Sequence, residues 1–312
     1  MFQELANLDR RLFRTKQCEL QSKSRSARPE RRAYTQIIVR KSSMETLMNT
    51  VAKHQRAHST QPVHQTEAAP SHNRVATSSL VRRIEAIDWF NVEQELNGYG
   101  CAMLRELLTA RECDALSALY PRDELYRSRV VMARHGFGRG EYKYFAYPLP
   151  PLIAGLRREL YPHLVPVANR WNEAMGIDIR YPAAHAEFIE RCHAAGQTRP
   201  TPLILQYATD DYNCLHQDLY GEHVFPLQVA ILLSEPGEDF TGGEFVMTEQ
   251  RPRMQSRTEV VPLRKGDAVV FAVHHRPVQG TRGAYRVNLR HGVSRLRSGR
   301  RHTLGVIFHD AA

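Results

Sequence analysis

The chain has 312 residues, which is enough for one large domain or two small ones around a buried core. Hydrophobic residues make up 42% and charged residues 24%, and no apolar run approaches the ~20 residues of a membrane span, so we expect no membrane partner. The formal net charge is +10, but residues 1–79 hold 14 Lys and Arg against 6 Asp and Glu. Because the rest of the chain is near neutral, charge alone does not identify a nucleic-acid-binding protein.

The cysteines predict a reducing environment. There are five of them, widely spaced and without a C-x-x-C pair, so neither a disulfide framework nor a zinc knuckle is expected. The N-terminus has no apolar segment followed by a cleavage site of small residues, which argues against export. We therefore expect a cytoplasmic protein.

Residues 1–79 form a basic segment rich in Arg, Ser, Gln, Thr and His, and they lack helical or strand periodicity. We predict a disordered tail that catalysis does not need, because a tract with few large apolar residues has little surface to bury. Two other interpretations stay open: a basic arm that docks nucleic acid, or an extension upstream of a later start codon such as Met44 or Met48.

Residues 80–200 predict a mixed, mainly helical support for the rest of the protein. Apolar residues recur at helical spacing from Leu80 to Phe90, and Thr109 with Glu112 forms a capping box ahead of a short helix. The other expected elements are a strand in 98–104, a strand, turn and strand in 127–147, and helices in 150–175 and 183–195.

Residues 201–312 are rich in short β-type runs: PLILQYA, FPLQVAILL, GEFVM, EVVPL, DAVVFAV, YRVNLRHG and HTLGVIF. Seven such runs separated by Gly, Pro and Asp predict an antiparallel jelly roll or barrel, and hence an α+β protein with N-terminal supporting helices. The chain has no G-x-G-x-x-G motif after a strand and no Walker-type loop, so a nucleotide-binding fold is disfavoured.

A metal site is indicated by NCLHQDLYG, in which His216 and Asp218 stand two residues apart at the end of a strand-like run. Side chains at i and i+2 of a strand share one face, so both can reach one ion. His291, in RVNLRHGVS, can supply a third ligand. Two imidazoles and one carboxylate leave positions open on an octahedral ion, which is the arrangement of non-haem Fe(II) oxygenases.

A carboxylate site is indicated ten residues beyond His291. There Arg301 opens the last apolar run, and its planar fork can hold a carboxylate through two hydrogen bonds. Tyr207, just before the H-x-D run, can add a hydroxyl donor. Gly242 and Gly243 permit a tight turn between these motifs.

In this series of motifs the chain resembles the Fe(II)- and 2-oxoglutarate-dependent dioxygenases, and within them the prolyl 4-hydroxylase-like branch. The resemblance covers residues 202–310, and more weakly residues from 80 on. It implies a double-stranded β-helix that holds Fe(II) through His216, Asp218 and His291, with 2-oxoglutarate on the metal and its distal carboxylate on Arg301 and Tyr207. It also implies O₂ as a substrate, succinate and CO₂ as products, and ascorbate as a candidate reductant.

The resemblance favours hydroxylation of a prolyl-type C–H bond in a protein or peptide. The chain is also similar to bacterial proline-hydroxylase-like proteins that have been assigned to oxidative demethylation of damaged DNA, so an alkylated nucleic acid is the alternative substrate. Two alternatives of other classes are a non-catalytic metal-binding jelly roll and a nucleic-acid-binding protein, the latter because eight arginines lie between positions 276 and 301. The oligomeric state is not predicted.

Other polar residues fit a site less well. His274 and His275 could replace His291 as a ligand, but no arginine follows them at the required spacing. Glu190 and His193 form an E-x-x-H on a predicted helix that also carries His185, and a di-iron bundle needs two such motifs, so we expect a solvated helix face. No G-x-S-x-G motif supports a hydrolase. We expect His309 and Asp310 at the surface.

Overall fold

The computed structural model describes residues 72–219 and 221–312, with side chains from Ser79 on. These residues fall within a single unit that spans residues 68–312. The predictions for residues 1–71 lie outside the described residues. Helix α2 (His72–Glu85) begins eight residues before the expected boundary at Leu80, but Leu80 is the first residue of the buried core.

The helices after residue 100 lie where the sequence predicts them, within a few residues, whereas Trp89–Tyr99 is helical nine residues beyond the predicted pattern, which ends at Phe90. The capping box is present, with the Thr109 hydroxyl accepting from the Glu112 backbone and the Glu112 carboxylate accepting from the Thr109 backbone. The elements before residue 200 are α3 (Trp89–Tyr99), β1 (Cys101–Leu104), α4 (Ala110–Ser117), β2 (Tyr126–Val131), β3 (Gly138–Arg139), β4 (Glu141–Phe145), α5 (Pro151–Ala174) and α6 (His185–Ala194). Among the described residues, no helix is both long and apolar enough to cross a membrane.

All seven predicted β-type runs contain strands, and further short strands lie between them. The strands after residue 200 are β5 (Leu203–Ala208), β6 (Tyr212–His216), β7 (Leu227–Leu232), β8 (Phe240–Gly242), β9 (Phe245–Gln250), β10 (Arg257–Val261), β11 (Ala268–Ala272), β12 (His275–Gly280), β13 (Gly283–Val293) and β14 (Leu296–Val306).

The strands form two antiparallel sheets, which confirms the jelly roll. Within the described residues, the major sheet has eight strands in the order β1-β11-β7-β14-β5-β4-β2, with β8 on β14. The minor sheet has six strands in the order β10-β9-β13-β6-β3, with β12 on β13. Because β1, β2 and β4 come from residues 80–200 but pair in the major sheet, the expected support and catalytic regions share one sheet.

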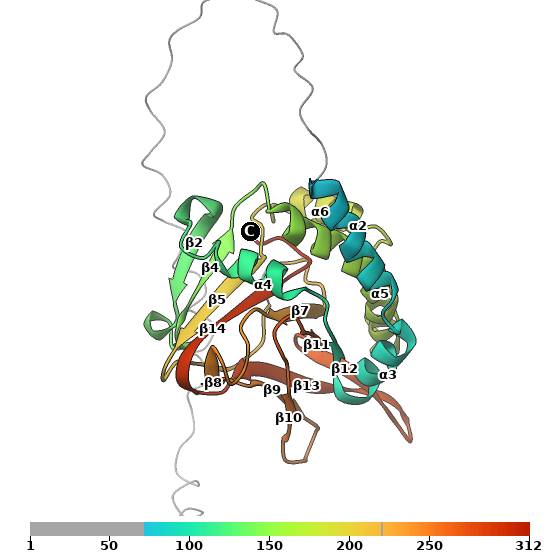
Figure 1. Ribbon diagram of the computed structural model, residues 1–312. Coiled ribbons are helices and arrows are strands. Elements are labelled where there is room, and N and C mark those ends of the chain that lie inside the picture. The colour runs from blue at the N-terminus through green and yellow to red at the C-terminus, as the bar shows by residue number, and fades with distance from the viewer. Residues whose placement is uncertain (1–71, 220) are drawn as a thin grey trace, which may run out of the picture. The chain divides into compact units, whose positions relative to one another are not determined.

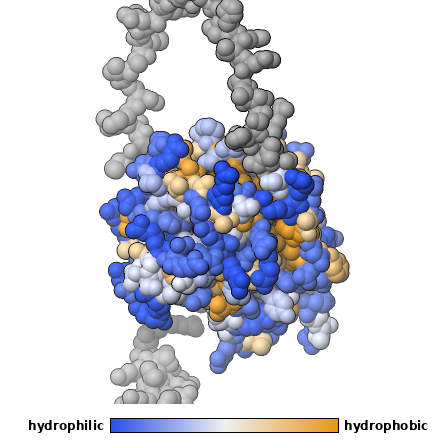
Figure 2. Space-filling view, viewed as in Figure 1, coloured by the Kyte–Doolittle hydropathy of each residue, from blue (hydrophilic) through white to orange (hydrophobic). Residues whose placement is uncertain are grey.

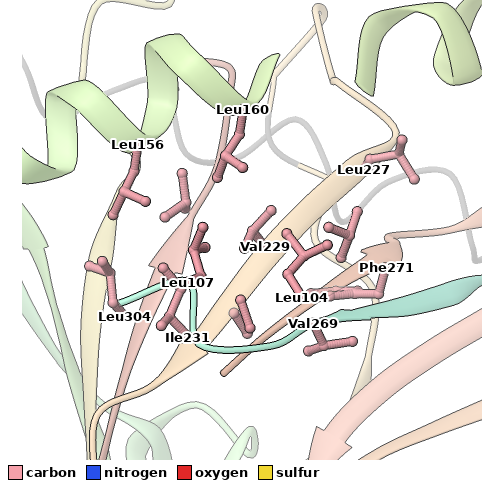
Figure 3. Close-up of a cluster of buried hydrophobic side chains, with 14 of the residues drawn as sticks. Leu104, Leu107, Leu156, Leu160, Leu227, Val229, Ile231, Val269, Phe271 and Leu304 are labelled. Carbon is pink, nitrogen blue, oxygen red and sulfur yellow. The ribbon is translucent and has the colours of Figure 1, made fainter. Parts of the chain in front are cut away.

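The helices cover the outer face of the major sheet. Figure 1 shows α2, α3, α5 and α6 gathered on one side of the strands. In Figure 3, Leu156 and Leu160 of α5 point toward the strands that carry Val229 and Leu304. These side chains are buried in one hydrophobic cluster, so the outer face of the sheet is filled by helix packing and the space between the sheets is left for a site.

The outer surface carries both hydrophilic and hydrophobic residues. Figure 2 shows a mostly hydrophilic face, with hydrophobic residues gathered on the side where the helices lie in Figure 1. Phe90 at the start of α3 is the most exposed large hydrophobic side chain of the described residues, at 74%.

Candidate active site

The two histidines of the predicted metal site are cross-strand neighbours. His216 is the last residue of β6, and His291 lies opposite it on β13. Asp218 follows two residues after His216, beyond the end of the strand. One ligand atom from each of the three residues lies within 4.8 Å of the others. The pairing of β6 with β13 therefore brings two motifs that are 75 positions apart in the sequence to one point.

The donor atoms of these three residues suit a shared cation. His216 Nε2 lies 3.4 Å from Asp218 Oδ1, and His291 Nε2 lies 3.4 Å from Asp218 Oδ2, both longer than the ~2.9 Å of a good N–H···O hydrogen bond. His216 Nδ1 lies 2.8 Å from the Cys214 carbonyl oxygen, a contact that puts the proton on Nδ1 and leaves Nε2 free to bind a metal. Two histidines and one carboxylate match the ligand set of non-haem Fe(II) sites.

Electrostatics favours the protonation state that metal binding requires at His291 and Asp218, and opposes it at His216. Burial lowers the pKa of His291, so its imidazole is neutral at physiological pH. Burial raises the pKa of Asp218, but its contacts with the two histidines outweigh that effect and hold the pKa well below its ordinary value. Burial likewise lowers the pKa of His216, but the Asp218 carboxylate outweighs it and the net shift is upward. A bound metal cation would replace the proton that this upward shift favours on the His216 imidazole.

The predicted carboxylate site lies in the major sheet. Arg301 on β14 and Tyr207 on β5 are direct cross-strand partners, and the Arg301 guanidinium carbon lies 5.7 Å from the Tyr207 ring centroid. Both side chains are fully buried. Arg301 donates to the Thr303 hydroxyl, but its Nε and the Tyr207 hydroxyl have no hydrogen-bond partner among the described residues. Burial lowers the pKa of Arg301 to about 10, so it is still charged at neutral pH.

Two glycines allow these side chains to pack closely. Gly243 has a φ of +67°, and a Cβ atom there would lie 2.5 Å from Leu296 and 3.2 Å from Arg301. Gly140 has a φ of +110°, and its Cβ would lie 2.9 Å from the Tyr207 ring. Both positions require the left-handed backbone that glycine adopts without strain. Gly242 ends β8 and Gly243 lies in the two-residue connection to β9, and both have positive φ.

A cavity of about 290 Å³ between the two sheets joins the metal residues to the carboxylate site. All five predicted site residues line it: Tyr207, His216, Asp218, His291 and Arg301. Its other walls are mostly apolar or aromatic, with Phe245 and Phe271 beside His291. The site is therefore a mostly apolar chamber with one group of potential metal ligands and one buried cation.

Several residues that line the cavity were not predicted from the sequence. Thr303 shares the face of Arg301 by strand alternation, which the i, i+2 spacing could have revealed. Gln228 is a buried polar residue within an apolar strand, and its Nε2 has no partner among the described residues. Tyr142, Tyr144 and Phe137 also line the cavity, but no local signal singles them out because β4 and β3 reach it only through sheet pairing.

The competing histidines lie elsewhere. The rings of His274 and His275 are in tilted contact, and His275 contacts Asn288, whereas the metal-ligand group of the described residues contains neither. Glu190 and His193 are exposed on α6, as expected, but His185 on the same helix is half-buried, with its Nε2 2.8 Å from the Phe308 carbonyl oxygen.

The prediction that His309 and Asp310 lie at the surface is wrong, because both are fully buried. The Asp310 carboxylate pairs with Arg157 of α5 at 2.6 Å and also contacts His193 and Tyr147. The end of the chain passes between α5, α6 and the loop before β5, and a sequence position near the terminus carries no sign of that packing.

The arginine-rich stretch divides between the interior and the surface. Of its eight arginines, Arg276 and Arg301 are buried and the other six are exposed. Arg276 donates to Glu249 and to the carbonyl oxygens of Asn97 and Gly98, so it ties the end of α3 to the minor sheet. The two buried arginines therefore cannot contact nucleic acid.

Comparison with known proteins shows that more than half of the chain matches one protein family. Residues 140–311 match the Oxygenase-NA family, described as an oxygenase catalysing oxidative methylation of damaged DNA. Two Mycobacterium tuberculosis proteins, Uncharacterized protein MT2286 (strain CDC 1551 / Oshkosh) and Uncharacterized protein Rv2227 (strain ATCC 25618 / H37Rv), are each 51% identical over 168 residues. Those residues are 54% of this chain and 72% of each relative.

Solved structures with similarity include a Pseudomonas putida prolyl-4-hydroxylase, 13% identical, with a TM-score of 0.42 over 72% of this chain and 99% of that one. Another is a Burkholderia pseudomallei oxidoreductase of the 2OG-Fe(II) oxygenase family, 18% identical, with a TM-score of 0.42 over 73% of this chain and 94% of that one.

Proposed function

Because the chain belongs to the Oxygenase-NA family of oxygenases, we propose that it oxidises a C–H bond of its substrate with Fe(II), 2-oxoglutarate and O₂. The observation that carries this proposal is the buried Arg301, which has no ion pair with any described residue and lies in the same cavity as the His216, Asp218 and His291 donors. A buried cation without a carboxylate partner is costly unless a ligand supplies one. A protein that only bound a metal ion would not need a buried arginine beside the metal site.

The residues have distinct tasks in this proposal. His216, Asp218 and His291 would hold Fe(II), which when bound supplies the activation of O₂ that hydroxylation requires. Arg301 and Tyr207 would hold the distal carboxylate of 2-oxoglutarate, since both present unpaired donors to the cavity. Thr303 orients Arg301 by accepting one of its hydrogen bonds.

The cavity walls would protect the reaction from water. Phe245 and Phe271 pack against the His291 ring at centroid distances of 6.1 and 4.5 Å. This apolar wall beside His291 strengthens the electrostatic interactions within the cavity and limits the access of water to the metal site.

For the substrate we propose an alkylated base in DNA, which the family description supports. The cavity wall supports it too, because it includes Tyr142 and Tyr144 in an edge-to-face pair and Phe137, which is 48% exposed. Aromatic side chains accept the face of a base in a sequence-tolerant way. Hydroxylation of a methyl group on a base nitrogen would convert N–CH₃ to N–CH₂OH, which then releases formaldehyde and leaves N–H.

The test is product formation by the purified full chain with Fe(II), 2-oxoglutarate and ascorbate. Succinate release should rise when a methylated single-stranded oligonucleotide is added, and formaldehyde should appear in equal amount. The unmethylated oligonucleotide and the His216→Ala protein serve as controls and should give neither increase. Succinate without formaldehyde in the presence of the methylated strand would contradict the DNA substrate but not the oxygenase.

Prolyl hydroxylation is the second candidate, supported by the sequence motifs from H-x-D to Arg301 that resemble the prolyl 4-hydroxylase-like branch. A proline-containing peptide in the same assay should leave succinate release at its uncoupled rate. Stimulation by the peptide, with a mass gain of one oxygen atom, would place the prolyl reaction first.

We also propose that the protein works in the cytoplasm. The four cysteines in the described part of the chain are all free, and three of them are buried. Free thiols of this kind suit a reducing compartment.

A further inference from the structure

A second arginine with an aromatic partner lies beside the cavity, on the edge strand of the major sheet. Arg127 of β2 places its guanidinium carbon 4.5 Å from the ring centroid of Tyr144, a residue of the cavity wall. Its Nε donates to the Pro200 carbonyl oxygen at 2.8 Å. The guanidinium is thus held in one orientation by a hydrogen bond on one side and a cation–π contact on another.

Arg199, next to Pro200 in the chain, brings another positive charge to this place. Its backbone is fixed by two hydrogen bonds with Ala311, at 2.9 and 2.8 Å, while its side chain is exposed. The C-terminal end of the chain lies in this region, near β4 in Figure 1. Arg127 is thus held against Tyr144, and Arg199 lies one residue before the Pro200 carbonyl that Arg127 contacts.

The carboxylate that acts electrostatically on Arg127 is Asp310, and it is engaged by other groups. Asp310 contacts Arg157, His193 and Tyr147. Within residues 72–219 and 221–312, neither Arg127 nor Arg199 is in an ion pair with a carboxylate within 4.0 Å. Burial lowers the pKa of Arg127, Tyr144 and Asp310 raise it, and the charge of Arg199 lowers it because the two cations repel each other. An anion between them would relieve that repulsion.

We propose that Arg127 and Arg199 form a phosphate-binding subsite that grips the backbone of a nucleic acid strand while one of its bases enters the cavity beside Tyr144. This proposal rests on the proposed DNA substrate and assigns the residues that would position it. The guanidinium fork matches two oxygens of a phosphate, and the contacts of Arg127 with Pro200 and Tyr144 organise it before the strand arrives. A phosphate contact positions the strand without reading its sequence.

The experiment compares substrates with and without phosphate. The variants are Arg199→Ala, Arg199→Glu, Arg127→Gln and Arg127→Lys, and the matched control is Arg282→Ala, an exposed arginine on the turn between β12 and β13. Binding is measured by fluorescence anisotropy with a labelled methylated single-stranded oligonucleotide. Turnover is measured with the same oligonucleotide and with the methylated nucleoside, which has no phosphate.

Arg199→Ala and Arg127→Gln should each weaken oligonucleotide binding roughly five- to thirtyfold and reduce the slope of log affinity against log salt by about 0.7. Arg199→Glu should weaken binding further, and Arg127→Lys should retain part of the affinity because a point charge lacks the fork. The KM for the methylated nucleoside and the uncoupled release of succinate should match the wild type in every variant, and Arg282→Ala should match it in all assays.

Three outcomes would overturn the subsite. One is oligonucleotide binding that is unchanged in Arg199→Glu and Arg127→Gln. Another is an equal rise in KM for nucleoside and oligonucleotide, which would indicate a general distortion of the cavity. The third is a dependence on these arginines for an acidic peptide substrate with none for the oligonucleotide. If the wild type releases no succinate from 2-oxoglutarate, the proposed function itself fails, which is a separate result.

Discussion

Two buried arginines of this protein have nearly equal exposure and opposite surroundings. Arg157 of α5 is 2% exposed, and each of its three nitrogens donates a hydrogen bond, to Ile307, Tyr147 and Asp310. Arg301 of β14 is 1% exposed, donates only to Thr303 and has no ion pair within the described part of the chain.

This difference in hydrogen-bond and ion-pair partners distinguishes a structural arginine, Arg157, from a ligand-binding one, Arg301. The free-energy cost of removing a guanidinium from water is offset only when an opposite charge and hydrogen bonds inside the protein replace its contacts with water. At Arg157 the chain supplies both, so the pair with Asp310 ties α5 to the end of the chain. At Arg301 it supplies neither in full, and the unpaired donors face a cavity that also contains the metal residues. Burial without a partner is therefore the feature that points to function.

The largest effect is expected from the metal residues that share the cavity with Arg301. Asp218→Ala and His291→Ala should each reduce succinate release by roughly a thousandfold or more, because metal chemistry contributes several kcal/mol to the barrier. Fe(II) binding, measured by titration calorimetry, should weaken in parallel. His274→Ala is the control and should keep turnover. Full activity in His291→Ala with loss in His274→Ala would contradict the ligand set.

Next in size is the loss of Arg301. Arg301→Ala should raise the KM for 2-oxoglutarate roughly a hundredfold, since two charge-assisted hydrogen bonds are removed while all the metal donors stay. Fe(II) affinity should change little, and the melting temperature should hold or rise because an uncompensated buried charge is gone. Arg301→Lys should recover part of the effect. If the exposed Arg300→Ala shows the same defect instead, the carboxylate contact lies on the other face of β14.

Removal of the partner of Arg157 should act on stability instead. Asp310→Asn should lower the free energy of unfolding by about 3–5 kcal/mol, because it leaves a buried guanidinium without its counter-charge. The measure is urea denaturation followed by circular dichroism, and the KM for 2-oxoglutarate of the folded protein should stay within about twofold of the wild type. The exposed pair of Arg122 and Glu124 provides the control, and Glu124→Gln should cost under about 1 kcal/mol.

The smallest effect is the pH dependence of that stability difference. Burial raises the pKa of Asp310, but Arg157 and the hydrogen bonds from His193 and Tyr147 outweigh it and lower the pKa below its ordinary 3.8. A carboxyl group with a depressed folded pKa stabilises above its unfolded pKa, and this contribution is lost as pH falls through the folded pKa. The gap between wild type and Asp310→Asn should therefore be constant from pH 7 to about 5 and shrink below about 4. A gap that widens in acid would contradict the sign of this shift.

Local periodicity accounts for what could be predicted of the fold. The helices, the capping box at Thr109 and the β-type runs after residue 200 depend on residues within about ten positions of one another. The sequence did not reveal that β1, β2 and β4 join the major sheet, because strand pairing joins segments far apart in the chain.

The sequence by itself determined the chemistry of the candidate site: an H-x-D motif, a later histidine and an arginine ten residues beyond it, with His216, His291 and Arg301 on strands whose alternation sets their faces. Only the tertiary structure decided which residues meet. The pairing of β13 with β6 sets His291 against His216, and the pairing of β14 with β5 sets Arg301 against Tyr207. It also buried His309 and Asp310 and brought Tyr142 and Tyr144 to the cavity wall. The physical reason is that a side chain's face follows from its own strand, whereas its neighbours follow from a register fixed by packing across the whole sheet.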